Sequence, residues 1–361
     1  MLLMAYGGPG SLDEVEPFLL DVRGGRETPG ELVEEVTARY RAIGGGSPIL
    51  ERSREQARAL EGELARGGGE WRVFVGMRHW HPYIRQAVGE IVAEGFDELV
   101  ALCLTPQESS MSVGAYFREL DRALDRALDG ALEGARLAGA AEAGATEPHP
   151  ALAEGPGART TGSPPALRRI RSWHDHPGFV DAVAARVEEA LRRFPGPGSP
   201  GRPHEPEVQV VFTAHSLPES ILKEGDPYDR QVRETAARVA ERVAARTGRA
   251  LPWQVAYQSA GARAVPWLGP SLDETLRRLA SEGGSAVDST VSREGSPEGR
   301  PAVLVAPVGF VSDHVEILYD LDVEAREEAR ELGVRLERTA SLNDSPDFIA
   351  ALADLVRSAL R

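Results

Sequence analysis

The sequence has one cysteine, Cys103, and one lysine, Lys223, among its 361 residues. A single cysteine cannot form an internal disulfide, and it cannot supply the thiolates that hold an iron–sulfur cluster, so both features are excluded. Cys103 lies within the apolar stretch ELVALCL, which is typical of a small core residue. The near-total use of arginine is more typical of coding bias than of design, although the arginine fork also suits carboxylate ligands.

Long hydrophobic runs and an excess of positive charge are also absent. No apolar stretch approaches the roughly 20 residues that span a bilayer, and the sequence does not begin with a basic region followed by an apolar one. We therefore expect a cytoplasmic protein with no transmembrane segment. The 41 Lys and Arg residues stand against 56 Asp and Glu residues, for a net charge of -15. This charge disfavours nucleic acid and anionic lipid as partners, so a local basic cluster has to hold any anionic ligand.

The length suits two domains of ordinary size, each able to bury its own core. Six runs are apolar on both faces, which is typical of parallel strands covered by helices on either side. These predicted strands are residues 2–6, 71–77, 98–104, 208–214, 253–258 and 302–308. Helical periodicity predicts helices at 30–43, 47–66, 81–95, 112–130, 177–194, 228–247, 269–282, 312–332 and 346–360. The pattern predicts an α/β fold with two doubly wound parallel sheets.

A domain boundary is expected near residue 174, where RRIRSWHDHPGF resumes a strand-like pattern before a helix. This divides the chain into an N-terminal domain at 1–174, a C-terminal domain at 175–340 and a C-terminal helix within 341–361. Residues 131–167 are rich in Ala, Gly and Pro and have no hydrophobic period, and residues 283–301 are similar. We interpret both segments as flexible insertions.

Polar side chains follow the predicted strands. Ligands of open α/β sheets bind at the carboxyl ends of the strands. The segments found there are AYGGPG, RHWHPY, TPQESS, HSLPES, QSAG and GFVSDHVE, which together contain histidines, hydroxyls and a carboxylate. His79 and His81 of RHWHPY flank a proline, and we expect them to be exposed at a helix start. The glycine-rich stretches lack a Walker lysine and the GxGxxG spacing, and no GxSxG, HExxH or CxxC motif is present.

His215 stands where the strand predicted at 208–214 ends. Two interpretations are open. Ser216 and Glu219 fit a capping box, which would leave the histidine a structural role. Alternatively, neutral imidazole near pH 7 can act as a base or as a metal ligand.

Three carboxylates, Glu316, Asp320 and Glu324, are spaced four residues apart. On a helix this spacing aligns them along one face, where like charges repel unless a cation or a proton lies between them. Glu316 could instead complete a capping box with Asp313, and a solvated acidic face is a further alternative. Together with His215, the row could deliver a hard cation or carry protons away.

Five long motifs, in this order along the chain, resemble the ferrochelatase family and most closely its Gram-positive type, which metallates coproporphyrin III. They are MAYGGPG, RYRAIGGGSPI, TAHSLPESILKEGDPY, YQSAGARAVPWLGP and APVGFVSDHVEILYDLD. The resemblance implies two Rossmann-like domains with a porphyrin cleft between them, as in class II chelatases. It also implies insertion of Fe2+ into a porphyrin in haem biosynthesis, with coproporphyrin III giving coprohaem. Fe2+ and the porphyrin are then substrates, and no tightly bound cofactor is expected.

The resemblance also implies roles for individual residues. The metal-side histidine and glutamate of the family fall on His215 and Glu316. Asp320 and Glu324 then form an outer cation or proton route, which could hold Mg2+ or another divalent cation. The tyrosine that such enzymes place over the porphyrin metal falls on Tyr6. The contacts to the propionates and the macrocycle fall on Arg23, Arg39, Tyr40, Ser47 and Tyr116.

The sequence departs from the family at three positions. Gly24 stands where relatives often have a second arginine, so we expect a contact of the family to be missing there. His81 stands where an acidic residue is frequent and Gln107 where a histidine is common in the Gram-positive branch, so we expect metal delivery to differ around those two positions. The alternatives are a protoporphyrin IX ferrochelatase, a sirohydrochlorin cobalt or nickel chelatase, and a non-catalytic porphyrin or haem carrier. The acidic row favours an enzyme. A transient contact with a downstream coprohaem-processing enzyme is implied by the family alone.

Overall fold

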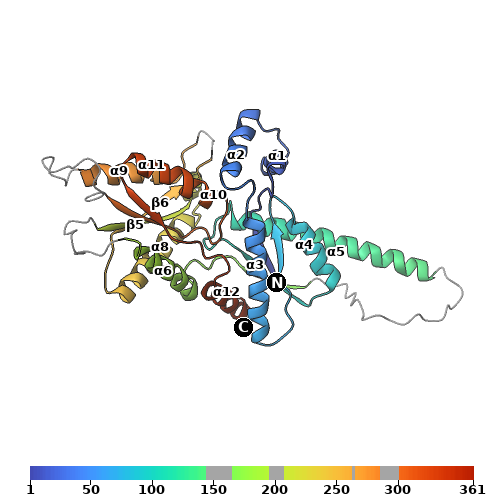
Figure 1. Cartoon of the computed structure of the whole chain (residues 1–361). Helices are drawn as coiled ribbons and strands as arrows, with labels where there is room; N and C mark the ends of the chain where they lie inside the picture. Colours follow the sequence, from blue (N-terminus) through green and yellow to red (C-terminus); the bar gives the residue numbers. More distant parts are fainter. Residues whose placement is uncertain (144–164, 195–206, 262–264, 285–300) are drawn as a thin grey trace.

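Two four-stranded parallel sheets form the body of the protein (Figure 1). The computed structural model describes residues 1–143, 165–194, 207–261, 265–284 and 301–361. The first sheet has the order β2-β1-β3-β4 and contains β1 (Leu2–Ala5), β2 (Phe74–Met77), β3 (Glu98–Cys103) and β4 (Ala166–Ile170). The second has the order β6-β5-β7-β8 and contains β5 (Val208–His215), β6 (Trp253–Gln258), β7 (Ala302–Pro307) and β8 (Arg335–Arg338). The predicted α/β fold with two doubly wound sheets is confirmed.

The two sheets share one topology, and each has its switch point at its first strand. β1 pairs with β2 on one side and with β3 on the other, and β5 pairs with β6 and β7 in the same way. Strand order therefore reverses at β1 and at β5, and ligands of such sheets bind outside the carboxyl ends of the strands at this point. Tyr6 directly follows β1 and His215 is the last residue of β5. The fold thus places these two side chains at equivalent positions in the two halves.

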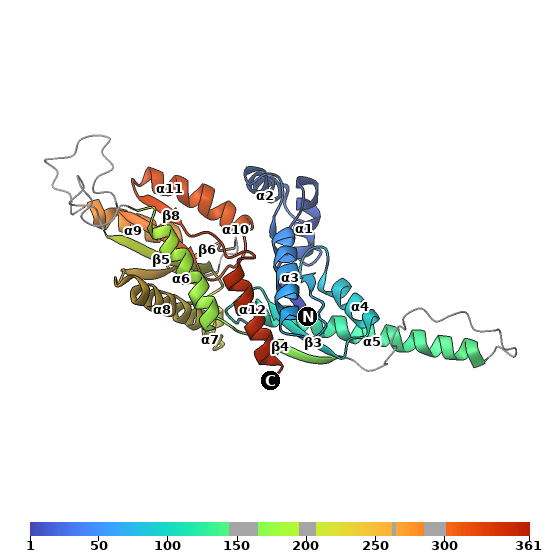
Figure 2. The ribbon, with the colours of Figure 1, turned by 60° about the horizontal axis from the view of Figure 1, so that its bottom comes forward.

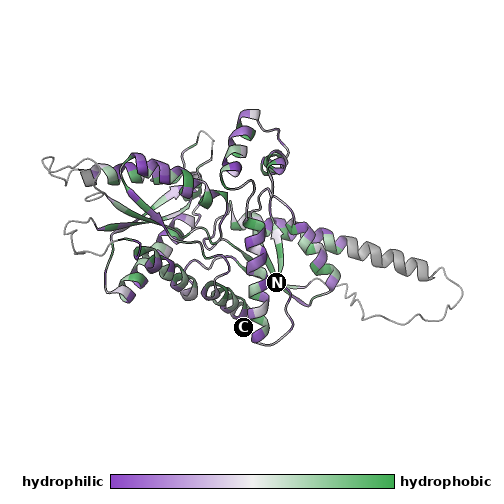
Figure 3. Ribbon diagram, in the orientation of Figure 1, coloured by the Kyte–Doolittle hydropathy of each residue, from purple (hydrophilic) through white to green (hydrophobic). Residues whose placement is uncertain are grey.

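Helices cover both faces of the first sheet. Alternate residues of β1 point to opposite faces, so Met4 packs with α4 (Ile84–Glu94) and α5 (Val113–Ala143), whereas Leu3 packs towards α3 (Ile49–Arg66). Figure 3 shows hydrophobic residues concentrated on the strands and on the inward sides of the helices.

The second sheet is covered in the same way. One face packs against α9 (Leu272–Gly284), α10 (Val315–Leu318) and α11 (Arg326–Glu331), with Val211 in that core. The other face packs against α6 (Pro177–Leu191) and α8 (Tyr228–Thr247).

The last helix, α12 (Pro346–Ala359), joins the two halves. It packs against both α3 and α6 and lies between the sheets (Figure 2). Its Phe348 is fully buried, 5.9 Å between ring centroids from Trp173. Burying a side chain of this size stabilises the folded state by about 1.5–3 kcal/mol. This helix therefore stabilises the contact between the two halves as well as each half.

Buried glutamines also connect the halves. Gln56 on α3 donates from Nε2 to the Ser312 hydroxyl and to the Asn343 carbonyl, both at 2.9 Å. Gln107 after β3 donates to the Thr235 hydroxyl at 3.2 Å and to the Val308 carbonyl at 3.0 Å. Gln107, where metal delivery was expected to differ, is therefore a fully buried structural link.

A helical arm projects from the first sheet (Figure 1). It contains the short 3-10 helix η1 (Leu12–Glu14), α1 (Val15–Val22) and α2 (Gly30–Ala42). The chain enters and leaves the arm through a narrow neck, where the Ser47 amide donates to the Pro9 carbonyl at 2.7 Å. A Cβ on Gly46 would lie 2.3 Å from the Gly10 carbonyl oxygen, so only glycine allows this approach. The arm therefore emerges at the carboxyl end of the first sheet, beside Tyr6.

All six predicted strands are present, and β4 and β8 are additional. The interpretation of 131–167 as a flexible insertion is wrong at both ends, because α5 continues to Ala143 and β4 begins at Ala166. Residues 144–164 lie outside the described residues, as do 285–300, and residues 283–284 belong to α9. The predicted boundary near 174 falls between β4 and α6 and stays a prediction. Within the described chain, no helix is both long and apolar enough to cross a membrane.

Candidate active site

His215 and Glu316 meet at the carboxyl end of the second sheet. His215 ends β5, Glu316 lies on α10, and His215 Nε2 is 3.7 Å from Glu316 Oε2. Gln258, the last residue of β6, donates from Nε2 to the Glu316 carbonyl at 2.7 Å and so fixes α10 against the neighbouring strand. The structure thus brings together the two residues that the sequence selected.

His314 is a third member of this cluster, and the sequence analysis missed it. Its Nε2 lies 3.9 Å from the same Glu316 oxygen, and its Nδ1 donates to the Ser312 carbonyl at 2.9 Å. His215 Nδ1 likewise donates to the Ser216 carbonyl. Because a carbonyl accepts the Nδ1 proton, each neutral ring presents an unprotonated Nε2 to Glu316. Two sequence signals for His314 were available, its position two residues before Glu316 and its place in the segment GFVSDHVE after a predicted strand.

The Glu316 Oε2 atom is buried and has no hydrogen-bond partner among the described residues. Burial acts to raise the pKa of Glu316, but the positive charge that His215 and His314 carry when they are protonated, together with hydrogen bonding from His314, outweighs burial and lowers it. The carboxylate is therefore ionised at neutral pH, between two imidazole nitrogens, with an open acceptor atom. Such an arrangement suits a proton or a cation in transit. No group of three His, Cys, Asp or Glu side chains in the described part of the chain closes into a metal cage.

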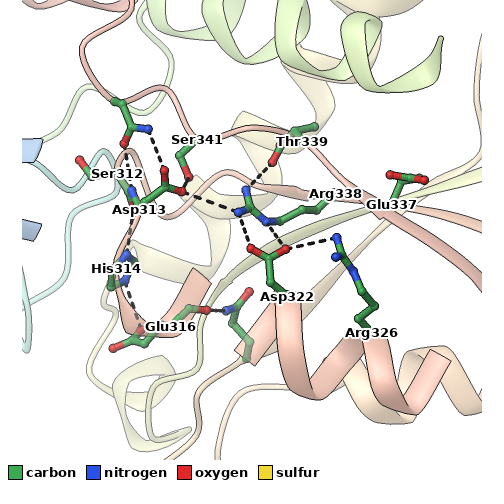
Figure 4. A network of polar contacts seen from close by, with 12 residues as sticks. Ser312, Asp313, His314, Glu316, Asp322, Arg326, Glu337, Arg338, Thr339 and Ser341 are labelled. Atoms are coloured by element: carbon green, nitrogen blue, oxygen red, sulfur yellow. Dashed lines mark hydrogen bonds and ion pairs between the residues drawn. The ribbon is translucent and has the colours of Figure 1, made fainter. Parts of the chain in front are cut away.

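The capping boxes proposed as alternatives do not form. α10 begins after His314 with no side-chain cap, and Asp313 instead accepts from Ser341 at 2.7 Å and pairs with Arg338 at 3.8 Å (Figure 4). Ser216 donates its hydroxyl proton to the Leu268 carbonyl at 2.8 Å. His215 and Glu316 are thus held by backbone and loop contacts, which leaves their side chains free to face each other.

The acidic row continues into a π-helix, η2 (Asp320–Ala325), where the α-helix was predicted. The Glu324 amide donates to the Tyr319 carbonyl, five residues back, at 3.0 Å. Burial and the charges of Glu316 and Glu324 raise the pKa of Asp320 to about 6. Asp320 is therefore close enough to Glu316 and to Glu324 to be repelled by both. Single-turn π-helices are rare and frequently occur at functional sites.

Arg39 crosses from the arm to this row. Its guanidinium lies 3.8 Å from Asp320, 3.9 Å from Glu324 and 5.3 Å from the centroid of the Tyr319 ring. The family resemblance assigns Arg39 to the contacts with the propionates and the macrocycle, and this stays a prediction. In the structure Arg39 also pairs with Glu35 at 2.9 Å, so it lies between Glu35 and the acidic row. It also connects α2 of the arm to the segment that follows β7 of the second sheet.

Two phenols, Tyr6 and Tyr40, lie within the electrostatic influence of Glu316. Burial and the nearby charge of Glu316 raise the pKa of Tyr6 to about 12, and the same two causes raise that of Tyr40. Both phenols are therefore neutral at working pH, and the shared influence of Glu316 places them near the cluster. The Tyr6 ring packs 4.8 Å from the His79 ring, and His79 donates to Asp21 at 2.9 Å. His79 is half-buried, so the expectation of an exposed histidine is wrong.

The remaining predicted contacts are dispersed. Arg23 caps the C-terminus of α1, pairs with no carboxylate among the described residues, and has a buried Nε with no partner. Ser47 lies in the neck, against Gly8. Tyr116 is 4% exposed within the core beneath the first sheet, so its predicted ligand contact has no support from its position and stays a prediction.

The two parallel sheets carry histidine, carboxylate and tyrosine side chains at their switch points, an arrangement that fits an α/β metal chelatase. A solved structure described as SirB from Bacillus subtilis with Fe3+ shares this fold, with a TM-score of 0.50, 12% identity, and 99% of this chain and 94% of that chain covered. The ferrochelatase family model matches residues 1–135 and 156–360. This chain belongs to the ferrochelatase family.

Similar proteins cover nearly the whole chain. A ferrochelatase of Deinococcus radiodurans is 37% identical, covering 99% of this chain and 94% of its own length. A ferrochelatase of Thermus thermophilus is also 37% identical, at 99% and 98%. A coproporphyrin III ferrochelatase of Geobacillus kaustophilus is 33% identical, at 99% and 94%. Family membership makes this chain a porphyrin metal chelatase, which inserts ferrous iron into a porphyrin in haem synthesis.

Proposed function

We propose that the porphyrin substrate is coproporphyrin III and that the product is coprohaem. The observation that carries this proposal is Arg23, a cation on the arm with no carboxylate partner in the described chain. Coproporphyrin III has four propionates where protoporphyrin IX has two, and each hydrogen bond to an ionised group is worth about 1.5–3 kcal/mol. In a chain of net charge -15, free cations at the cleft favour the more anionic porphyrin.

In the proposed mechanism, His215 and Glu316 carry the chemistry of insertion. Two pyrrole N–H protons must leave the porphyrin, and Fe2+ must exchange its water ligands for the four ring nitrogens. The free Nε2 of His215 accepts a proton or binds the arriving iron, and Glu316 balances the charge that develops. His314 offers a second Nε2 to the same carboxylate. A positioned base of this kind typically contributes ~10²- to 10⁴-fold.

Asp320 and Glu324 extend this route outward, as acceptors for protons or as ligands for Mg2+ or another divalent cation. Arg39 occupies them in the structure, so a cation at this face has to displace that guanidinium. Tyr6 packs over the porphyrin from the opposite wall, with Tyr40 and Ser47 as hydroxyl contacts. No tightly bound cofactor is part of the proposal, and we place the reaction in the cytoplasm with a downstream coprohaem-processing enzyme as acceptor.

Anaerobic steady-state kinetics with Fe2+ test the choice of porphyrin. We expect kcat/KM to be higher for coproporphyrin III than for protoporphyrin IX. Arg23→Ala should narrow this preference, because it weakens the binding of coproporphyrin III, with four carboxylates, more than the binding of protoporphyrin IX, with two. If the wild type metallates protoporphyrin IX as well or better, the coproporphyrin proposal fails while family membership stands. A single stoichiometric turnover would instead indicate a carrier.

A further inference from the structure

Arg78 occupies the switch point of the first sheet, beside Tyr6. It directly follows β2, and its amide donates to the Ala5 carbonyl at 2.9 Å. The amide of the next residue, His79, donates to the Tyr6 carbonyl at 2.9 Å. Backbone hydrogen bonds to the end of β1 thus fix Arg78 at the edge where ligands of this fold bind.

The Arg78 side chain lies over Tyr116. Its guanidinium carbon is 5.7 Å from the centroid of that ring, and Nη1 donates a long hydrogen bond to the Met111 carbonyl at 3.4 Å. This contact uses one of five N–H donors. Met111 is 41% exposed and Arg78 is half-buried, so the guanidinium lies close to the protein surface.

No carboxylate within the described part of the chain pairs with Arg78, and two nearby ones are already engaged. Asp21 accepts from His79 and from Tyr83. Asp226, across the interface, accepts from the Ser109 and Ser110 hydroxyls.

The positive charge of Arg78 acts on two nearby tyrosines, Tyr6 and Tyr116. It acts to lower the pKa of Tyr6 and of Tyr116, against the stronger effect of burial. Arg39, the cation of the facing arm, is occupied by Asp320 and Glu324. Within the residues that the structure describes, Arg23 and Arg78 therefore remain without carboxylate partners, and they lie on different elements, the arm and the end of β2.

We propose that Arg78 binds a carboxylate of the porphyrin substrate, with the Tyr116 ring as its platform. This inference rests on the proposed function and adds a second, separate cation to the cleft. A porphyrin with carboxylates around its whole rim can engage Arg23 and Arg78 at once. A porphyrin whose two carboxylates are adjacent can engage only one of these two arginines at a time. If that arginine is replaced, the porphyrin can turn in the cleft and bind the other one. Arg78 thus contributes to specificity for the more carboxylated substrate.

Binding of metal-free porphyrins, followed by fluorescence, tests this role in Arg78→Met, which keeps the apolar stem on Tyr116. We expect the Kd for coproporphyrin III to rise about tenfold or more, as for loss of a charge-assisted contact. The Kd for deuteroporphyrin IX, which has two propionates, should change less than about threefold because that ligand can turn. The double variant Arg23→Ala/Arg78→Met should then weaken deuteroporphyrin IX about tenfold. Arg78→Lys should restore part of the coproporphyrin III affinity.

Arg126→Met is the matched control, because Arg126 is exposed further along α5 and its loss changes the net charge equally. It should leave both affinities within about twofold. Unchanged coproporphyrin III binding in Arg78→Met, or no recovery in Arg78→Lys, would overturn the proposal. These binding measurements do not depend on which porphyrin the wild type metallates faster. The kinetic comparison tests the proposed substrate, so the two proposals can fail independently. If Arg78→Met does not fold, the comparison of Arg78→Lys with the wild type decides.

Discussion

Two half-buried carboxylates at the end of the second sheet, Glu316 and Asp320, have opposite pKa shifts. Glu316 lies between two imidazoles, which lower its pKa despite burial, whereas burial and the charges of Glu316 and Glu324 raise the pKa of Asp320 to about 6. Environments that separate two carboxylates in this way are typical of sites where one acts as an anion and the other exchanges protons. An ionised, buried Asp320 also costs stability, which is the usual cost of a functional site.

We expect Asp320→Asn to stabilise the cation-free protein at pH 7–8. The pKa of Asp320 is about 6 in the folded state against 3.8 for the ordinary carboxyl, so ionisation at pH 7 opposes folding. By linkage this amounts to about 1–3 kcal/mol. The folded state binds the proton first as pH falls through 6, so the advantage of asparagine should shrink and vanish near pH 4. Urea unfolding in EDTA between pH 4 and 8 measures this.

Glu324→Gln provides the control, because its side chain is 49% exposed. Its effect on the free energy of unfolding should stay within about 0.5 kcal/mol. A destabilising Asp320→Asn, or a gain that does not change with pH, would contradict the account of the acidic row.

At the scale of elements, the sequence predicted those strands that are buried on both faces. β4 was indicated only by the strand-like pattern at RRIR and β8 was missed, because both are edge strands, with the sequences ALRRI and RLER, in which arginines interrupt any apolar run. Edge strands commonly carry such charges because these discourage pairing with other chains. The π-helix η2 could not be predicted either, since a spacing of four suits an α-helix as well.

The part of the candidate site that depends only on the order of strands and helices could be predicted from the sequence. His215 and Glu316 follow predicted strands, and strand ends gather at one edge of a parallel sheet. His314 and Arg78 escaped because their roles depend on tertiary neighbours, namely the Ser312 carbonyl for the one and an absence of acidic partners for the other. No local pattern in the sequence encodes those surroundings.

The end of α5 offers a test of the element boundaries. α5 extends well beyond α4, away from the body (Figures 1 and 2). Replacing 131–164 with a flexible Gly-Ser linker should preserve folding and activity. Extending the deletion to residue 167 should lower Tm, because it also removes Ala166 and Leu167, which pair with Glu98 and Leu99 of β3. Thermal unfolding of both deletions decides, and equal Tm values would contradict the observed start of β4.

For the whole molecule, the buried glutamine links and α12 join the halves into one cooperative unit. Gln107→Leu removes the donor to Thr235 and Val308 while keeping a similar volume. The unsatisfied carbonyl should cost about 1–3 kcal/mol, with a single unfolding transition at a lower urea midpoint.

Gln209→Leu is the matched control, since Gln209 on β5 is half-buried with no side-chain hydrogen bond in the described chain. Its effect should stay within about 0.5 kcal/mol. Two separate transitions in the wild type would show that the halves unfold independently.

The most direct test of the account is multiple-turnover iron insertion by His215→Ala and Glu316→Gln, with porphyrin affinity measured in parallel. If these residues move protons and iron at the second switch point while the arm and the first sheet bind the porphyrin, kcat should fall at least ~10²-fold. The porphyrin Kd should then stay within a few fold of the wild type. Retained turnover in either variant, or an equal loss of porphyrin binding in both, would contradict the account.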